Sequence, residues 1–311
     1  MVSLPDKFVK RIKLWYLYKY INIYERRFNM TPAIIDLHTH TTESDGSFTP
    51  EELIAEAKRV GLSAIAITDH DTIAGIQKAA LLAVANDIEL IPGIELSTDY
   101  HGKEVHVVGL YIDIEDSYLL EQLQEFKNCR DNRNELIVAN LQKEGFDITM
   151  DALKAENPDC VITRANIARF LYEHGMIPSI QTAFEKYIGD HCKCFVNRFK
   201  ITPMDAVRLI KKAGGTAILA HPLLYHLSDT RLQQLIDNMK EAGLDGIEAI
   251  YCTYTPSEER QMKQLAQKNG LLISGGSDFH GTTKPNLNLA TGYGKLYIPY
   301  EVLENIKVSR N

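Results

Sequence analysis

The feature that most constrains this 311-residue chain is a regular alternation of short β-branched runs with segments of helical periodicity. Seven runs predict strands, at residues 33–37, 63–68, 89–96, 104–111, 216–220, 246–250 and 271–274. Helical patterns lie between most of them, at residues 50–60, 73–85, 203–213, 230–242 and 256–269. Alternation of this kind predicts a parallel sheet with helices packed against it, either open or closed into a barrel.

Capping residues mark the ends of these helices. Three helices share one start signal, a threonine N-cap followed by proline at the first helical position: Thr49-Pro50, Thr202-Pro203 and Thr255-Pro256. Four helices share one stop signal, a glycine just past the last turn: Gly61, Gly214, Gly243 and Gly270. The predicted boundaries therefore depend on capping chemistry as well as on hydrophobic periodicity.

The alternation breaks between residues 117 and 198. That block predicts helices at 117–144, 149–155, 163–174 and 179–187, and no strand until 194–197. A long helical block inserted between two strands predicts a lid or substrate domain. We therefore expect an N-terminal extension at 1–30, a barrel built from 31–115 and 199–311, and a helical insert at 116–198 that covers the substrate.

Residues 1–30 form a basic and aromatic extension. They carry seven Lys or Arg against Asp6 and Glu25, a net +5 in a chain of net charge −7, so the remainder stands at −12. The segment lacks the apolar core and the small-residue cleavage site of a signal peptide. Two interpretations stand: an interfacial amphipathic helix, or a stretch upstream of a true start at Met30. We assign it no function.

Composition excludes several classes of protein. Apolar residues make up 45% and charged residues 24%, which is ordinary for a globular chain. An acidic body does not suit a large DNA-binding surface, so we expect no stable DNA complex. No apolar run is long enough to cross a bilayer, so we expect no membrane partner. Five cysteines form no even disulfide framework, which favours reduced thiols in a cytoplasmic protein. The oligomeric state is left open.

Histidines and acids gather at the predicted strand ends. His38 and His40 fall on one face of a strand, because side chains alternate with period two, and they can share one metal ion. The other members of this set lie in six further segments: Asp45, Asp69 and His70, Glu95, His106, His221, and Asp278 with His280. Any one of them is more often a core residue or part of an acid–base pair.

The combined pattern is much more specific than its parts. If the strands are parallel, seven segments deliver these groups to one face, and α/β barrels and open sheets place their sites there. Burying so many ionisable groups without a cation would be very costly. A set of His and carboxylate ligands without thiolate suits Zn, Mn or Fe. Cys192-Lys193-Cys194 lacks zinc-knuckle spacing, and we interpret it as structural.

Five motifs resemble the signature of the PHP (polymerase and histidinol phosphatase) superfamily. They are His38-Thr39-His40, Thr68-Asp69-His70, Gly93-Ile94-Glu95, Ala220-His221-Pro222 and Ser277-Asp278-Phe279-His280. The resemblance runs from Ile34 to about Tyr300, nearly the whole chain. It implies an α/β fold, a distorted (βα)7 TIM-like barrel with an inserted helical domain and three divalent metal ions.

The resemblance also allots the metal ligands. One ion would take His38, His40, Glu95 and Asp278. A second would share Glu95 and add His106 and His221. The third would take Asp45, His70 and His280. Asp69 is a candidate catalytic residue, either as a proton acceptor or as a group that only orients a ligand.

The insert is similar to the branch that includes nucleoside 3′,5′-bisphosphate phosphatases and a 5′-to-3′ exoribonuclease. The similar segments are residues 163–169 and 183–189, and Arg164-Ala165-Asn166 stands where that branch has Arg-Pro-His. Arginine forks match phosphate bidentately. Arg164, with Arg133 and Arg198, is therefore expected to bind the rest of the substrate; Arg130 lies three residues from Arg133 on one helix face.

The expected activity is a metal-dependent phosphoesterase that hydrolyses small nucleotides or short RNA by a metal-activated water. Two alternatives stay open. A histidinol-phosphate phosphatase would use the same metal site, and substrate assays separate the two. A metal-bound regulatory or polymerase-associated module would show lost ligands or a fused polymerase, whereas this ligand set looks complete.

Overall fold

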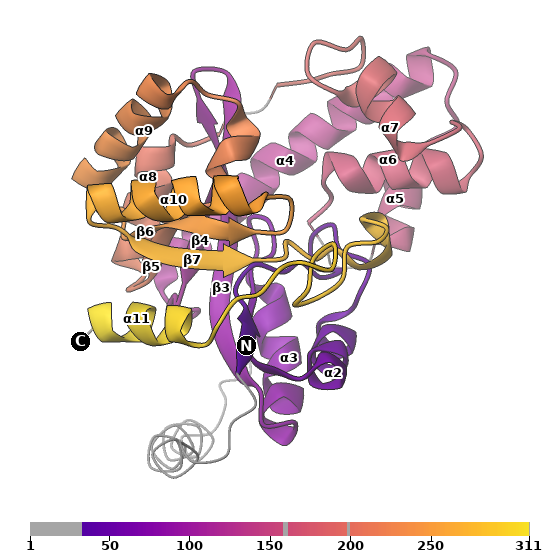
Figure 1. The fold of residues 1–311 in the computed structure, drawn as a ribbon. Helices are drawn as coiled ribbons and strands as arrows, with labels where there is room; N and C mark the ends of the chain where they lie inside the picture. The colour runs from indigo at the N-terminus through magenta and orange to yellow at the C-terminus, as the bar shows by residue number, and fades with distance from the viewer. Residues whose placement is uncertain (1–32, 158–160, 198–199, 311) are drawn as a thin grey trace. The chain divides into compact units, whose positions relative to one another are not determined.

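The computed structural model describes residues 33–157, 161–197 and 200–310, and residues 34–311 form one unit of the fold. Seven strands lie in one sheet in sequence order (Figure 1). The strands are β1 (Ile34–Asp36), β2 (Leu62–Ile67), β3 (Glu89–Tyr100), β4 (Lys103–Leu110), β5 (Thr216–Leu219), β6 (Gly246–Tyr251) and β7 (Leu272–Gly276). Each strand predicted from the β-branched runs is present.

The expectation of a parallel sheet is wrong at β4. This strand pairs antiparallel with both β3 and β5, while the other neighbouring pairs are parallel. The reason is the connection between β3 and β4, a two-residue turn in which His101 and Gly102 have φ of 54° and 80°. Parallel strands need a long crossover, so a turn this short forces a hairpin. The first half of β4 therefore lies at the same end of the sheet as the carboxyl ends of the parallel strands.

The sheet nearly closes on itself, because β7 returns beside β1. Leu37 N–H donates to the carbonyl of Gly275 at 3.2 Å, and Asp278 N–H donates to the carbonyl of His38 at 2.9 Å. A bridge between Thr39 and Phe279 continues this contact past the ends of the strands. The result is a TIM-like barrel whose strand ends converge on one mouth.

Helices cover the outside of the barrel. They are α2 (Pro50–Val60), α3 (Ala74–Ala85), α8 (Pro203–Lys212), α9 (Asp229–Glu241), α10 (Pro256–Asn269) and α11 (Glu301–Ser309). The expected threonine caps are present: Thr49 and Thr255 form complete capping boxes, and Thr202 accepts from Asp205 N–H. Helices α2 and α3 pack on β2, and α8, α9 and α10 pack on β3 to β6.

The insert between β4 and β5 consists of α4 (Ser117–Lys143), α5 (Met150–Glu156), α6 (Arg164–Glu173), α7 (Ile180–Ala183) and the π-helix η2 (Phe184–Ile188). It has its own apolar core, which includes Ile137, Leu153 and Leu171. The strand expected at 194–197 is absent. Cys194 N–H donates to Tyr187 O and Phe195 N–H to Cys192 O, so this backbone closes turns within the insert.

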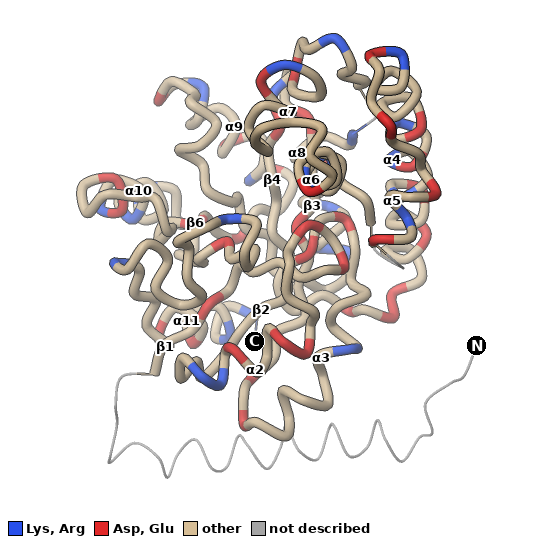
Figure 2. The backbone as a smooth tube through the Cα atoms, turned by 90° about the vertical axis from the view of Figure 1, so that its right-hand side faces the viewer, with Lys and Arg blue, Asp and Glu red and all other residues tan. Residues whose placement is uncertain are grey.

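Positions of basic and of acidic residues are both spread along the outer helices of the described part (Figure 2). Within that part, no helix combines the length and the apolar character that a bilayer crossing requires.

Candidate metal centre

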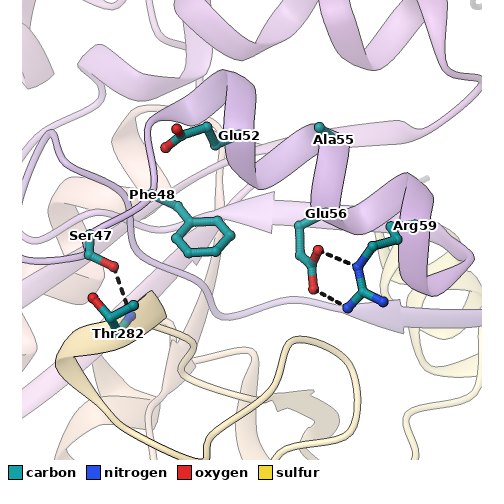
Figure 3. A pocket seen from close by; sticks show the side chains of 7 residues that line it. All are labelled: Ser47, Phe48, Glu52, Ala55, Glu56, Arg59 and Thr282. Carbon is teal, nitrogen blue, oxygen red and sulfur yellow. Dashed lines mark hydrogen bonds and ion pairs between the residues drawn. The ribbon is translucent and has the colours of Figure 1, made fainter.

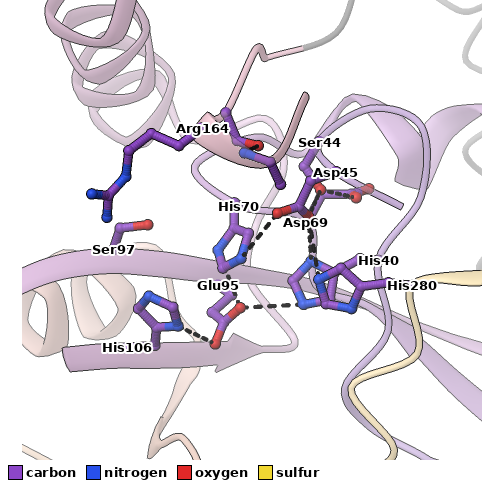
Figure 4. Close-up of polar contacts among 12 residues, drawn as sticks. His40, Ser44, Asp45, Asp69, His70, Glu95, Ser97, His106, Arg164 and His280 are labelled. Atoms are coloured by element: carbon purple, nitrogen blue, oxygen red, sulfur yellow. Dashed lines mark hydrogen bonds and ion pairs between the residues drawn. The ribbon is translucent and has the colours of Figure 1, made fainter. Parts of the chain in front are cut away.

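Histidines and acids far apart in the sequence meet at the mouth of the barrel (Figure 4). They come from the segments after β1, β2, β5 and β7, from the turn before α2, and from β3 and β4. The set consists of His38, His40, Asp45, His70, Glu95, His106, His221, Asp278 and His280. The structure therefore brings together all nine residues that we expected to bind metal. Arg198 lies outside the described residues.

Glu95 lies at the middle of this cluster, and its side chain is almost fully buried. Both carboxylate oxygens face imidazole nitrogens from five histidines. Oε2 lies 3.2 Å from His38 Nε2, His40 Nε2 and His70 Nδ1. Oε1 lies 3.0 Å from His106 Nδ1 and 3.2 Å from His221 Nε2. At Glu95, strand β3 pairs with Val108 of β4 on one side and bridges to His70 on the other, which holds the carboxylate in place.

Asp278 uses its two oxygens differently. Oδ1 faces the cluster, 3.2 Å from His40 Nε2 and 3.4 Å from His280 Nδ1. Oδ2 accepts hydrogen bonds from Tyr251 Oη at 2.7 Å and Lys284 Nζ at 2.6 Å. These two donors fix the carboxylate plane, so that one oxygen is turned toward the histidines.

Asp45 joins the cluster from a tight turn. Its Oδ1 lies 3.3 Å from His280 Nε2, and His40 and His70 approach its oxygens at 3.8 Å. The turn closes through N–H donation from Ser44 and Gly46 to the carbonyl of Thr41. A Cβ at Gly46 would lie 2.6 Å from the carbonyl oxygen of His40, so only glycine fits there.

Four overlapping groups of these residues have ligand atoms close enough to share an ion. They are His40–Asp45–His70–His280, His38–Glu95–His221, His38–His40–Asp278 and His70–Glu95–His106. The first contains the trio that the resemblance allots to one ion. Glu95 belongs to two of these groups, one with His221 and one with His106. The resemblance instead places both histidines with Glu95 at one ion, so the distances alone do not reproduce its assignment of ligands.

The residues fit a cluster of divalent cations. Several buried ring nitrogens form no hydrogen bond within the described part of the chain: His38 Nε2, His40 Nδ1 and Nε2, His70 Nδ1, His106 Nδ1 and His221 Nδ1. Those of His38, His40, His70 and His106 face carboxylate oxygens. Two acceptors at such distances repel unless a proton or a cation lies between them, and nitrogen with oxygen donors suits transition metals.

The acids and histidines of the cluster shift one another's pKa. Burial opposes ionisation of Glu95, but His38, His106 and His70 around it hold its pKa well below the usual range. Burial also opposes the charge on Asp278, and Lys284 with His280 and His38 lowers its pKa in the same way. Burial lowers the pKa of His70 to about 3, whereas at His40 and His106 the neighbouring carboxylates outweigh burial and raise the pKa to about 9 and about 10. Because a cation binds ionised carboxylates and neutral imidazoles, an ion that binds here must displace the protons on His40 and His106.

Asp69 is placed differently from the ligands. It is fully buried, and burial raises its pKa. Its Oδ1 accepts from Thr41 N–H at 2.7 Å and Ser44 Oγ at 2.6 Å, and its Oδ2 accepts from Thr41 Oγ1 at 2.7 Å. These bonds tie Asp69 to the turn that carries Asp45, which favours an orienting role over proton transfer.

The arginines expected to bind substrate lie in unequal settings. Arg164, at the start of α6, pairs with Glu104 Oε2 at 3.2 Å and Asp190 Oδ1 at 2.8 Å, and Figure 4 shows its side chain reaching toward Ser97. Glu104 in turn lies 3.5 Å from His106, so Arg164 contacts the cluster through Glu104. Arg133 is buried in α4 and donates to Asn134.

Arg130 is the buried partner of Asp71 and ties α4 to the loop after β2. A second contact joins the insert to the site. Asn166, which replaces the histidine of the related branch, donates through Nδ2 to the carbonyl of Ser44 at 3.2 Å. The insert therefore touches the two loops that carry His70 and Asp45.

A separate pocket of about 450 Å³ lies beside α2 (Figure 3). It is lined by Ser47, Phe48, Glu52, Ala55, Glu56, Arg59 and Thr282. Glu56 pairs with Arg59 there, and no member of the histidine cluster lines the pocket. The pocket is therefore separate from the cluster of histidines and acids at the barrel mouth.

Comparison with known proteins agrees with the geometry. Residues 36–196 match the PHP domain family. The chain belongs to the PHP domain family. A 5′-3′ exoribonuclease from Haemophilus influenzae is 38% identical over 245 residues, which cover 79% of this chain and 89% of that protein. A 3′,5′-nucleoside bisphosphate phosphatase from Chromobacterium violaceum is 34% identical over 250 residues, which cover 80% and 87%.

A solved structure shares the fold of this PHP chain. A protein from Bifidobacterium adolescentis, assigned as a metal-dependent phosphoesterase, superposes with a TM-score of 0.79 at 28% identity. The superposition covers 90% of this chain and 98% of that protein.

Three residues of the PHP site escaped the sequence analysis: Glu248, Tyr251 and Lys284. Glu248 could have been predicted from the sequence, because Gly246-Ile247-Glu248 repeats the tripeptide Gly93-Ile94-Glu95 and places a lone acid inside an apolar strand. Tyr251 and Lys284 carried no signal, since only the folded chain brings them to Asp278.

Proposed function

We propose that this chain is a metal-dependent phosphoesterase that acts on nucleoside 3′,5′-bisphosphates, on the 5′ ends of short RNA, or on both. The observation that carries the proposal is the cluster of imidazoles around Glu95, with its buried ring nitrogens facing carboxylates. The relatives named as an exoribonuclease and a bisphosphate phosphatase support the substrate class. We expect this activity in the cytoplasm.

Three ions, of Mn, Fe or Zn, are proposed for the site. His38, His40, Glu95 and Asp278 would hold the first. Glu95 with His106 and His221 would hold the second, and Asp45 with His70 and His280 the third. Bound divalent ions polarise a phosphate ester and make hydroxide available from water near neutral pH. The protein's own part is to hold these side chains in place, with Tyr251 and Lys284 aligning Asp278 and with Asp69 aligning the turn of Asp45.

The substrate beyond the reacting phosphate is proposed to lie under the insert. Arg164 stands at the edge of the cluster and is only partly buried, so its guanidinium can exchange its bond to Asp190 for a phosphate oxygen. Arg133 and Arg198 are proposed as further phosphate contacts. Glu104 forms ion pairs with both Arg164 and Lys200.

The test is a comparison of substrates with protein purified in the presence of manganese. We expect phosphate release from a nucleoside 3′,5′-bisphosphate, shortening of a 5′-phosphorylated oligoribonucleotide, or both. Histidinol phosphate is the third substrate, and preferential hydrolysis of it would replace the nucleotide assignment by the alternative phosphatase. Hydrolysis of none of the three would contradict the proposed activity.

Two histidine variants control the assay. His38→Ala removes a proposed ligand and should abolish hydrolysis. His174→Ala removes a histidine of the insert that lies apart from the cluster and pairs with Glu156. It should leave hydrolysis near the unmodified level. Equal activity of the two variants would show that the cluster is not the active site.

A further inference from the structure

Glu248 lies behind the proposed ligands and touches two of them at once. It projects from β6, and its side chain is about as buried as that of Glu95. Its Oε1 lies 3.0 Å from His38 Nδ1, and its Oε2 accepts a hydrogen bond from the backbone N–H of His221 at 2.8 Å. No Lys or Arg of the described chain forms an ion pair with it.

The contact with His38 determines which ring nitrogen carries the proton. An ionised carboxylate only accepts hydrogen bonds, so His38 Nδ1 must donate. In the neutral ring, the form that binds metal, the lone pair then lies on Nε2, which points to Glu95 Oε2 at 3.2 Å and Asp278 Oδ1 at 3.6 Å. A histidine that binds metal through one nitrogen usually donates the other to an acceptor of this kind.

We propose that Glu248 is a positioning residue for the metal centre. It fixes the tautomer and ring orientation of His38 and, through its second oxygen, the backbone that presents His221. The inference depends on the proposed metal site, because a buried carboxylate without Lys or Arg needs a cation nearby to offset its desolvation. His38 lies between the proposed ions and Glu248, and its Nδ1–H donates to the carboxylate.

The backbone of β7 beside this pair has no room for a side chain at position 276. A Cβ at Gly276 in β7 would overlap the Cβ of His38 and would lie 2.9 Å from Glu248 Oε1. Residue 276 must therefore be glycine for the two side chains to meet. His221 itself has a backbone φ of 24°, which an L-residue rarely adopts, and the bond from its N–H to Glu248 is one of the contacts that hold it there.

The experiment measures metal binding and does not require a substrate. Full-length protein is stripped of metal and titrated with Co²⁺ against a chelator, and the Co²⁺ absorption spectrum is recorded. The variants are Glu248→Ala and Glu248→Gln. The matched control is Glu89→Gln, a carboxylate at the start of β3 that binds Tyr300 and Lys307 and touches no proposed ligand.

We expect Glu248→Ala to weaken Co²⁺ binding by about 100-fold and to change the spectrum. Glutamine keeps one acceptor oxygen for the two donors, so Glu248→Gln should weaken binding by about 10-fold. Glu89→Gln should lower thermal stability only.

Unchanged Co²⁺ affinity and spectrum in a folded Glu248→Ala would overturn the proposal. If that variant does not fold, the same outcome in Glu248→Gln would do so. Absence of Co²⁺ binding by the unmodified protein would also overturn it. If the unmodified protein binds Co²⁺ and the variants weaken binding, the inference stands even when no tested nucleotide is hydrolysed, so it and the proposed function fail separately.

Discussion

Glu95 shows how one side chain can organise a whole site. Its two oxygens face five imidazoles that arrive from four different segments of the chain. The charge of Glu95 and a backbone held by β4 and by the bridge to His70 are both needed, because a flexible carboxylate could not serve so many partners.

Replacing Glu95 by glutamine removes this charge and keeps the shape of the side chain. We expect activity to fall by at least about 100-fold, since a proposed ligand should matter more than an outer partner of a ligand. The bound metal, measured by elemental analysis after purification, should fall as well. Glu121→Gln, on the exposed face of α4, is the control. Full activity and full metal content in Glu95→Gln would rule out a central role for this residue.

Asp69 and Ser44 offer a second test at this scale. Asp69→Asn leaves the donors on Thr41 and Ser44 short of an acceptor, so we expect a loss of about 1–3 kcal/mol of unfolding free energy in urea. Activity should fall with it, because the turn carrying Asp45 loosens.

A double-mutant cycle distinguishes the two roles considered for Asp69. If this residue only anchors the turn, Ser44→Ala should cause part of the same loss of activity, and the double variant should be less impaired than the sum of the two. A large loss in Asp69→Asn beside an unaffected Ser44→Ala would instead favour proton transfer.

The hairpin of β3 and β4 is the element that departs most from a regular barrel. Because β4 runs in reverse, His106 in its first half reaches the mouth together with residues from the ends of parallel strands. The insert then begins after β4, and its first helix, α4, returns to the mouth through Arg130 and Asp71.

Breaking that contact should destabilise the fold strongly. Arg130→Met removes the buried guanidinium that pairs with Asp71, whose other oxygen accepts from the Ser97 N–H, and we expect a loss of about 3–5 kcal/mol in urea unfolding. Arg59→Met removes the exposed partner of Glu56 and should leave the unfolding free energy essentially unchanged. Similar midpoints for the two variants would mean that the buried pair does not hold α4 to the barrel.

At the scale of the whole molecule, the apolar cores and the metal centre contribute separately to stability. Three clusters of buried apolar side chains surround the sheet, and they depend on no cation. The nine clustered acids and histidines lie at the mouth of the barrel, apart from these apolar clusters. The fold should therefore survive metal removal with a lower melting temperature.

Metal removal tests this separation. Protein stripped with a chelator should keep its far-UV circular dichroism but melt at a lower temperature, and added Mn²⁺ should restore both the melting temperature and the activity. An ion at 100 times its dissociation constant adds about 2.7 kcal/mol. An unchanged melting temperature after complete stripping would show that no ion binds the folded state, and loss of circular dichroism would show that the cores need the metal.

The sequence by itself determined the strands, most helix boundaries and the membership of the proposed metal cluster. These depend on local chemistry: period-two alternation, the caps of Thr49 and Thr255, and histidines and acids in seven short segments. Only the tertiary structure decided the direction of β4, the absence of a strand at 194–197 and the partners of Asp278. Strand direction and long-range partners depend on which segments pack together, and that information lies in no single stretch of the chain. Glu248 stands between the two cases: its lone charge in an apolar strand was visible in the sequence, but its role required the positions of His38 and His221.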